Sequence, residues 1–149
     1  MDSQKGTRKQ VEARRTLGLM KRMLMGFRTL LDEELRGEQV TTAQLRFLYE
    51  LRDQPAASGA QLARACYVTP QSAQTMMQRA VKRGWIVRAV NPENGRLLTA
   101  RLTPRGEKLL AQAEAVLLRL EAEVWSGVSV DRLREMNALI EAGLEKLQH

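Results

Sequence analysis

Apolar residues recur every three or four positions near both ends of this chain, which predicts long amphipathic helices there. One such stripe covers residues 11–35, and Gly37 ends the helix that it predicts. A second helix begins at Pro104, and a third follows the capping residue Ser129. The stripe positions are Leu17, Met20, Leu24, Phe27, Leu31 and Leu35 in the first helix, Leu109, Leu110, Ala113, Val116, Leu117, Leu120 and Val124 in the second, and Leu133, Met136, Leu139, Ile140, Leu144 and Leu147 in the third.

Between these long helices, two short segments begin with capping boxes. In each, a Ser or Thr and a Gln three residues later satisfy the free N–H groups of a first helical turn. The first pair is Thr41 with Gln44, and its helix runs to about Asp53. The second pair is Ser58 with Gln61, and its helix is short. Both signals are local, so they predict the two starting points directly.

A third short helix and a hairpin complete the central part of the chain. Thr69 precedes Pro70, whose missing N–H costs nothing in the first turn of a helix. Gly84 closes this helix. Two β-prone stretches follow at residues 86–90 and 97–102, and the Asn-Gly pair between them is a strong hairpin signal. The predicted fold class is mainly α with a small β-hairpin (α+β).

The net charge of +7 is concentrated in this central part. Residues 61–108 hold nine Lys and Arg against two acids, an excess equal to the net charge of the whole protein. The excess of three cations in residues 1–60 is cancelled by an excess of three acids in residues 109–149. A basic excess confined to a helix-turn-helix and a hairpin is typical of a protein that reads double-stranded DNA.

The helix over residues 70–83 has one polar face. Amide and hydroxyl side chains lie near its beginning and cations near its end, which suits a helix whose N-terminal half enters a DNA major groove. A Gln amide can pair twice with an adenine edge, and cations behind it can reach phosphates. Any surface helix has a polar face, but the cap, the turn, the hairpin and the local charge together favour DNA binding. The inward face is predicted to hold Ala73, Met76, Met77, Ala80 and Val81. The candidate DNA-contacting residues are Thr69, Gln71, Ser72, Gln74, Thr75, Gln78 and Arg79, with Arg96 at the hairpin tip.

A series of motifs extends over residues 41–110 in a fixed order. They are Thr42-x-Gln44, Gln61-Leu-Ala, Val68-Thr-Pro-Gln-Ser, Arg83-Gly-Trp-Ile-Val-Arg88, Asn91-Pro-Glu-Asn-Gly-Arg96 and Leu102-Thr-x-x-Gly106. In their order and spacing they resemble the MarR family of bacterial winged helix-turn-helix regulators. The sequence departs from the family pattern in the wing, where Asn91 and Asn94 stand in place of two acids, the second of which braces the arginine in the family.

This resemblance implies a homodimer built from the terminal helices, a palindromic operator in double-stranded DNA, and usually repression. It also implies release from DNA when a small aromatic or phenolic ligand binds between the dimer helices and the DNA-binding lobe. The base-contacting roles of the family fall here on Gln71, Ser72, Gln74 and Thr75, and the wing role falls on Arg96. A protein of this family is expected in the bacterial cytoplasm, associated with the nucleoid.

The expected domain organisation is a disordered basic tail over residues 1–10 and a single domain over residues 11–149. Within that domain, residues 41–103 form the winged helix-turn-helix lobe, and residues 11–36 and 104–149 form a helical dimerisation region. Each terminal helix carries a broad apolar stripe, and packing across a two-fold axis with a second copy would bury these stripes. A monomeric bundle would bury them as well.

Four residues of the first helix suggest an effector pocket. Met20, Met23 and Phe27 lie near Arg28, and adaptable thioethers beside one cation would accommodate an aromatic acid. The same stripe could serve simply as the core of a dimer. The two interpretations stay open at this point.

Cys66 is the only cysteine, so the chain has no internal disulfide and suits a reducing cytoplasm. Its spacing from Leu62 and Ala63 places it on the inward face of its helix, which favours a structural role over a redox-sensing one. The only histidine is His149, and no carboxylates cluster at a fixed spacing. The sequence therefore predicts no metal site, no cofactor and no enzymatic activity.

The sequence thus predicts a ligand-responsive, homodimeric transcription regulator that binds DNA, most simply a repressor. The most apolar stretch, residues 17–31, is interrupted by three cations, so no membrane association is expected, and the polar beginning lacks the features of a secretory signal. Two alternatives remain. One is a winged-helix DNA-binding protein that has no ligand. The other is a winged helix used as a protein-interaction module, which would need an acidic or apolar face on the helix over residues 70–83.

Overall fold

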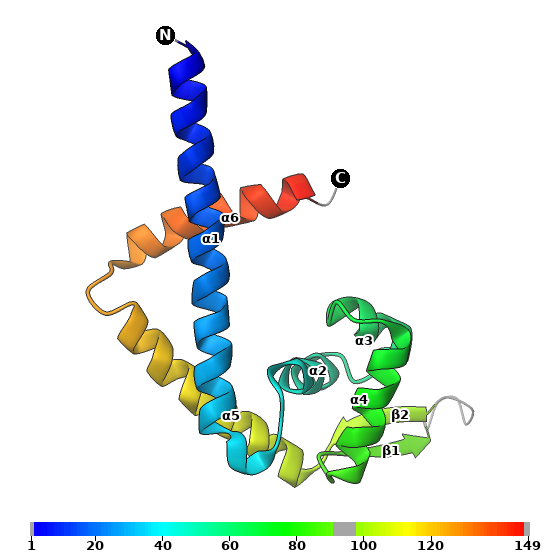
Figure 1. The fold of residues 1–149 in the computed structure, drawn as a ribbon. Coiled ribbons are helices and arrows are strands. Elements are labelled where there is room, and N and C mark those ends of the chain that lie inside the picture. The colour runs from blue at the N-terminus through cyan, green and yellow to red at the C-terminus, as the bar shows by residue number, and fades with distance from the viewer. Residues whose placement is uncertain (1, 91–97, 148–149) are drawn as a thin grey trace. The chain divides into compact units, whose positions relative to one another are not determined.

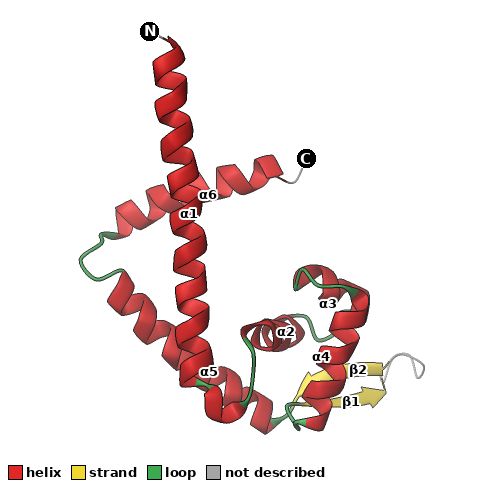
Figure 2. Cartoon of the chain, in the orientation of Figure 1, coloured by secondary structure: helices red, strands yellow, loops and turns green. Residues whose placement is uncertain are grey.

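The computed structural model describes residues 2–90 and 98–147 of the chain, and this part is mainly helical with one antiparallel hairpin (Figure 1 and Figure 2). The contacts divide the chain into two compact units, Met1–Leu117 and Leu118–His149. The predicted fold class is confirmed. The elements are α1 (Asp2–Glu34), a 3-10 turn η1 (Arg36–Glu38), α2 (Thr42–Asp53), α3 (Gly59–Ala65), α4 (Pro70–Lys82), β1 (Ile86–Val90), β2 (Leu98–Leu102), α5 (Pro104–Val124) and α6 (Val130–Leu147).

Helix α1 is longer than the apolar pattern predicted. It begins at Asp2, so residues 2–10 continue the helix where a disordered basic tail was expected. These residues include no proline, and their Gln, Lys and Arg side chains are compatible with a helix. Only the C-terminal end of α1 is anchored in the first unit, where Leu31 and the following Leu35 are buried.

Both predicted capping boxes are present. The Thr41 hydroxyl accepts from the Gln44 N–H at 3.2 Å, and the Gln44 side-chain oxygen accepts from the Thr41 N–H at 3.0 Å. Ser58 and Gln61 make the same pair of bonds at 3.2 and 2.8 Å. These caps fix where α2 and α3 begin. The four apolar residues of α2 that follow form the centre of the core: Leu45, Phe47, Leu48 and Leu51.

Trp85 is completely buried where α4 leads into β1. Gly84 adopts φ +73° and ends α4, and the backbone N–H of Trp85 donates to the Ala80 carbonyl at 2.9 Å. The Trp85 carbonyl accepts from the N–H of Thr103 at 2.9 Å. A Cβ at Gly106 would lie 2.1 Å from that carbonyl oxygen. The first turn of α5 can therefore approach Trp85 only because residue 106 has no side chain.

Thr103 completes this junction. Its hydroxyl donates to the Gly84 carbonyl at 2.6 Å and accepts from the Gly106 N–H at 3.1 Å, so it caps α5 and holds the end of α4 at once. The motif Leu102-Thr-x-x-Gly106 is thus explained by the close contact between the start of α5 and the segment that joins α4 to β1.

The hairpin pairs β1 with β2 in an antiparallel register, from Ile86 opposite Leu102 to Val90 opposite Leu98. Ile86 and Ala100 are buried against the core, and Arg88 is exposed. The predicted strands are confirmed. The predicted turn between them, with Asn91, Asn94 and Arg96, lies outside the described residues.

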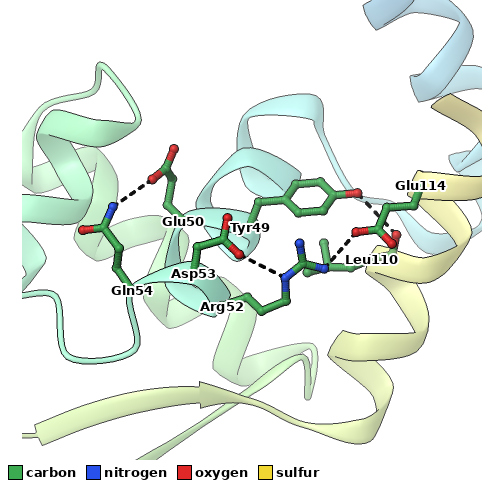
Figure 3. A network of polar contacts seen from close by, with 7 residues as sticks. All are labelled: Tyr49, Glu50, Arg52, Asp53, Gln54, Leu110 and Glu114. Atoms are coloured by element: carbon green, nitrogen blue, oxygen red, sulfur yellow. Dashed lines mark hydrogen bonds and ion pairs between the residues drawn. The ribbon is translucent and has the colours of Figure 1, made fainter. Parts of the chain in front are cut away.

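A polar network joins α2 to the first part of α5 (Figure 3). The Tyr49 hydroxyl donates to the Leu110 carbonyl at 3.3 Å, and the Arg52 guanidinium contacts the Glu114 carboxylate at 2.8 Å. The same guanidinium lies 5.1 Å from the centre of the Tyr49 ring. Burial, with a smaller contribution from Glu114, raises the pKa of Tyr49, so its hydroxyl stays protonated as a donor.

The second unit contains the end of α5, a turn and α6. Gly127 adopts φ +75° in the turn, and the Ser129 hydroxyl accepts from the Arg132 N–H at 3.4 Å. The predicted break at Gly127 and the predicted start of the last helix are confirmed. Large apolar side chains on α6 are strongly exposed, among them Leu139 and Leu147.

We expect the substitution Gly106→Ala to lower the free energy of unfolding by about 2–3 kcal/mol, because the added methyl group must displace the Trp85 backbone. Gly59→Ala is the matched control, since nothing lies within 4 Å of a Cβ there and the change should stay within about 1 kcal/mol. Urea unfolding followed by circular dichroism measures both. Equal stabilities of the two variants would show that the close approach imposes no constraint.

Candidate nucleic-acid interface

Helix α4 begins with the predicted cap. The Thr69 hydroxyl accepts from the Ser72 N–H at 3.1 Å and donates to the Ser72 hydroxyl at 2.9 Å, and Pro70 occupies the first turn. Ala73 and Ala80 are buried against the core, and Met76 is half-buried. Met77 is half-buried and belongs to the same face. The inward face is narrower than predicted, because Val81 is 41% exposed and was wrongly assigned to it.

The side chains on the opposite face fall into two groups. The hydroxyl groups are bonded within the helix: those of Thr69 and Ser72 form the cap, and that of Thr75 donates to the Gln71 carbonyl at 3.1 Å. The remaining side chains are exposed and make no hydrogen bond to other described residues. They are Gln71, Gln74, Gln78, Arg79 and Lys82. Three amides and two cations are therefore available to an external partner.

Grooves lie on both sides of this face. One, of about 410 Å³, lies between the start of α2 and α4 and is lined by Thr41, Gln44, Gln71, Ser72, Thr75, Met76 and Arg79. The other, of about 170 Å³, separates α4 from the start of α3 and the hairpin, and Gln74 and Arg88 are among its lining residues. Helix α4 thus forms a ridge between two grooves: Gln71 and Arg79 of α4 line one, and Gln74 of α4 with Arg88 of β1 line the other.

The segments that form the ridge and adjoin it in the sequence carry cations and no acidic side chain. No Asp or Glu occurs in the sequence between Asp53 and Glu93, a range that contains α3, α4 and β1. Arg64, Lys82 and Arg88 are all exposed in this range. Phosphate groups could approach the ridge without meeting a nearby carboxylate on the same segments.

Arg83 does not belong to this exposed set. Its guanidinium donates to the Gln39 side-chain oxygen at 3.1 Å and to the Glu38 carbonyl, and it lies 5.3 Å from the centre of the Trp85 ring. Its role is therefore to hold the end of α4 against the segment that precedes α2. The sequence offered one signal for this structural role, the position of Arg83 two residues before a tryptophan. The segment that it contacts lies more than forty residues away in the sequence.

The candidate effector residues lie on α1. Met20 and Met23 are 36% and 37% exposed, Phe27 is half-buried and Arg28 is exposed. They share one stretch of helix as predicted, but the chain by itself does not enclose them. Arg96, the candidate wing residue, lies outside the described residues.

Cys66 is half-buried at the C-terminal end of α3 and packs against the core. Burial raises the pKa of its thiol, and the Glu50 carboxylate adds to this effect, while Arg46 opposes it. The thiol is therefore mainly protonated at neutral pH, which is the unreactive form.

Two capped helices joined by a tight turn, with an antiparallel hairpin after the second, define a winged helix-turn-helix protein. A sequence profile of the MarR family matches residues 38–97. HTH-type transcriptional repressors of Mycobacterium tuberculosis and Mycobacterium bovis are 33% identical to the chain over 102 residues, which cover 68% of this chain and 73% of each relative. The chain belongs to the MarR family. This family consists of transcription regulators rather than enzymes, as the sequence predicted.

Solved structures agree with this fold. A MarR family transcription regulator is 24% identical with a TM-score of 0.83, and the match covers 95% of this chain and 94% of that one. A complex of S. aureus MepR with DNA is 21% identical with a TM-score of 0.75, covering 87% and 94%. The reduced form of MarR from E. coli is 24% identical with a TM-score of 0.69, covering 85% and 93%.

Two kinds of feature are absent from the described residues. No helix there is long and apolar enough to cross a membrane. No group of three or more His, Cys, Asp or Glu in that part of the chain could hold a metal ion.

We expect iodoacetamide to alkylate Cys66 more slowly in the folded protein at neutral pH than in the urea-unfolded protein, because the raised thiol pKa lowers the thiolate fraction. The folded rate should rise at a higher pH than the unfolded rate does. Mass spectrometry follows the single thiol in both states. Equal rates at neutral pH would contradict the structural assignment of Cys66.

Proposed function

We propose that this protein is a homodimeric transcription regulator that binds double-stranded DNA through α4. In this proposal it represses transcription from a palindromic operator and is released by a small aromatic or phenolic ligand. The observation that carries the proposal is the ridge of α4, whose exposed amides and cations have no partners among the described residues. Related proteins named as transcriptional repressors, and a similar fold solved with DNA, support it.

The side chains of α4 divide into two proposed roles. Gln71, Gln74 and Gln78 contact base edges, since an amide offers a donor and an acceptor together. Arg79 and Lys82 contact phosphates, which position the helix without reading sequence. Thr69 and Ser72 act mainly through the cap that presents the helix, with Thr75 beside them on the same face. Arg96 on the wing contacts the backbone or the minor groove.

The proposed dimer uses the terminal helices. Exposed apolar side chains run along α1 and α6, and large exposed apolar patches usually mark a surface that another protein covers. On α1 they include Leu17, Leu19, Leu24, Met25 and Leu30, and on α6 they include Leu139, Leu144 and Leu147. A second copy, related by a two-fold axis, supplies the matching surface and presents two copies of α4 to a palindrome.

Ligand release follows from a shift in dimer geometry. A ligand that binds better to a dimer whose two α4 helices no longer match successive major grooves lowers the affinity for DNA. Met20, Met23, Phe27 and Arg28 are the proposed pocket, completed by the partner subunit. Arg83 and the Tyr49–Leu110 contact connect the ends of α4 and α2 to neighbouring segments, so a movement of α1 or α5 is passed to the lobe.

The first test is binding to duplexes selected from a random pool by the purified protein. We expect Gln71→Ala to relax base preference at one or two positions of each half-site, at a cost of about 1–3 kcal/mol in discrimination. Lys82→Gln should weaken binding to all sequences and make the salt dependence shallower by about one unit per half-site. Fluorescence anisotropy at several salt concentrations measures both effects.

The same measurement on the parent protein tests the proposed function itself. Its affinity should fall steeply with salt because several phosphates are neutralised by each dimer. An affinity that does not change with salt, or a selection that enriches no sequence, would rule out specific DNA binding. Should Lys82→Gln alter base preference while Gln71→Ala lowers affinity evenly, the two proposed roles would be reversed.

The second test concerns assembly. Leu139 and Leu147 are 78% and 82% exposed, so replacing both with Gln should leave the protomer folded but weaken the dimer. Analytical ultracentrifugation over a range of concentrations should show a shift toward monomer.

Arg134→Gln with Glu141→Gln is the matched control, because it changes the same helix without removing apolar surface and keeps the net charge. The control should remain dimeric. A double-Leu variant that associates as tightly as the control would exclude α6 from the interface.

A further inference from the structure

The turn between α3 and α4 exposes one large aromatic side chain. Tyr67 is 87% exposed, more than any other large apolar or aromatic residue that the structure describes. Its backbone has φ +55°, in the left-handed region that glycine or asparagine adopts more readily than a bulky residue. The turn is nevertheless closed by backbone bonds, from the Tyr67 N–H to the Arg64 carbonyl at 3.1 Å and from the Val68 N–H to the Ala63 carbonyl at 3.0 Å. Folding alone would favour a smaller residue here.

The Tyr67 ring is held in place by a cation. The Arg46 guanidinium lies 5.6 Å from the ring centre, and it also donates to the Ala65 carbonyl at 3.1 Å and to the Glu50 carboxylate at 3.3 Å. The ring is therefore positioned from one side by a guanidinium that belongs to α2. Its other side faces solvent.

Tyr67 lies near the N-terminal end of α4, the end that is proposed to contact DNA. It lies two residues before the Thr69 cap, at the same end of α4 as Gln71. The sequence between Asp53 and Glu93 has no carboxylate, and Glu50 on α2 is paired with Arg46. An anion that follows the N-terminal end of α4 would thus reach Tyr67 in a positive environment.

We propose that Tyr67 is a contact to the DNA backbone beside the bases that α4 reads, and that Arg46 is its positioning residue. The Tyr67 hydroxyl donates a hydrogen bond to a phosphate oxygen, and the ring packs on the adjacent deoxyribose. A backbone contact adds affinity but no sequence information. This inference rests on the proposed function, because it assigns a further residue to the same DNA interface.

The test compares Tyr67→Asn and Tyr67→Phe with the parent protein. Asparagine tolerates the left-handed backbone, so the melting temperature of Tyr67→Asn should not fall. Its affinity should nevertheless fall about threefold to tenfold, and Tyr67→Phe, which loses only the hydroxyl, should show about a threefold loss. Anisotropy is measured with one duplex selected by the parent protein and with a scrambled duplex of equal length.

Four further results would separate a backbone contact from other roles of Tyr67. The loss should be equal on the two duplexes, and the salt slope should not change, because no cation is removed. Arg46→Ala should weaken binding as well, and the double variant with Tyr67→Asn should lose less than the product of the two single losses.

The possible outcomes distinguish failure of the proposed function from failure of the contact assigned to Tyr67. If the parent protein binds no duplex, the proposed function fails. If the parent binds and Tyr67→Asn binds equally well, only the contact assigned to Tyr67 is wrong. A changed base preference in Tyr67→Asn would overturn the backbone assignment, and a lower melting temperature with unchanged affinity would show that Tyr67 serves the fold alone.

Discussion

The close approach of α5 to the Trp85 carbonyl is the constraint on which the DNA-binding lobe depends. The space between Gly106 and that carbonyl admits no side chain, and Thr103 bonds to both segments at the same point. The junction therefore fixes the direction in which α4 ends, the place where β1 begins and the angle at which α5 leaves the hairpin. The exposed face of α4 is a consequence of this packing, because the buried Trp85 and Ala80 determine which side of the helix turns inward.

Polar contacts add orientation to this apolar core. The Arg52–Glu114 pair is exposed at both ends and contributes little free energy by itself, whereas the Tyr49 bond to the Leu110 carbonyl lies at the edge of the core. Together with Arg83, these contacts attach α2 and α4 to the segments on which they lie. In the proposed mechanism, these contacts would pass a displacement of the neighbouring segments to the lobe.

Local signals allowed much of the fold to be predicted from the sequence. The caps at Thr41, Ser58 and Thr69 lie within four residues of the groups that they satisfy, and the two β-prone stretches flank an Asn-Gly pair, so these elements were predicted correctly. The family was identified from the resemblance of the motifs. The periodicity of the apolar residues alone would not have identified it. What the sequence did not reveal has non-local causes: the role of Arg83 was missed because its partner Gln39 lies forty-four positions away, and Val81 was wrongly placed inward because its exposure depends on what packs beside α4. The turn around Tyr67 contains no Gly or Asn that would indicate a left-handed backbone, so the sequence did not identify Tyr67 as a candidate DNA-contacting residue.

The three glutamines of α4 have an evolutionary consequence. They are exposed and bond to no other described residue, so replacing one of them costs little stability. The residues that set the fold, Trp85 and Gly106 above all, tolerate no such freedom. In its proposed role the lobe thus uses different residues for folding and for reading DNA, and only the residues that read DNA can be replaced at little cost in stability. A duplicated copy of this gene could come to bind a different operator through single substitutions in α4. It would not first need stabilising mutations elsewhere in the protein.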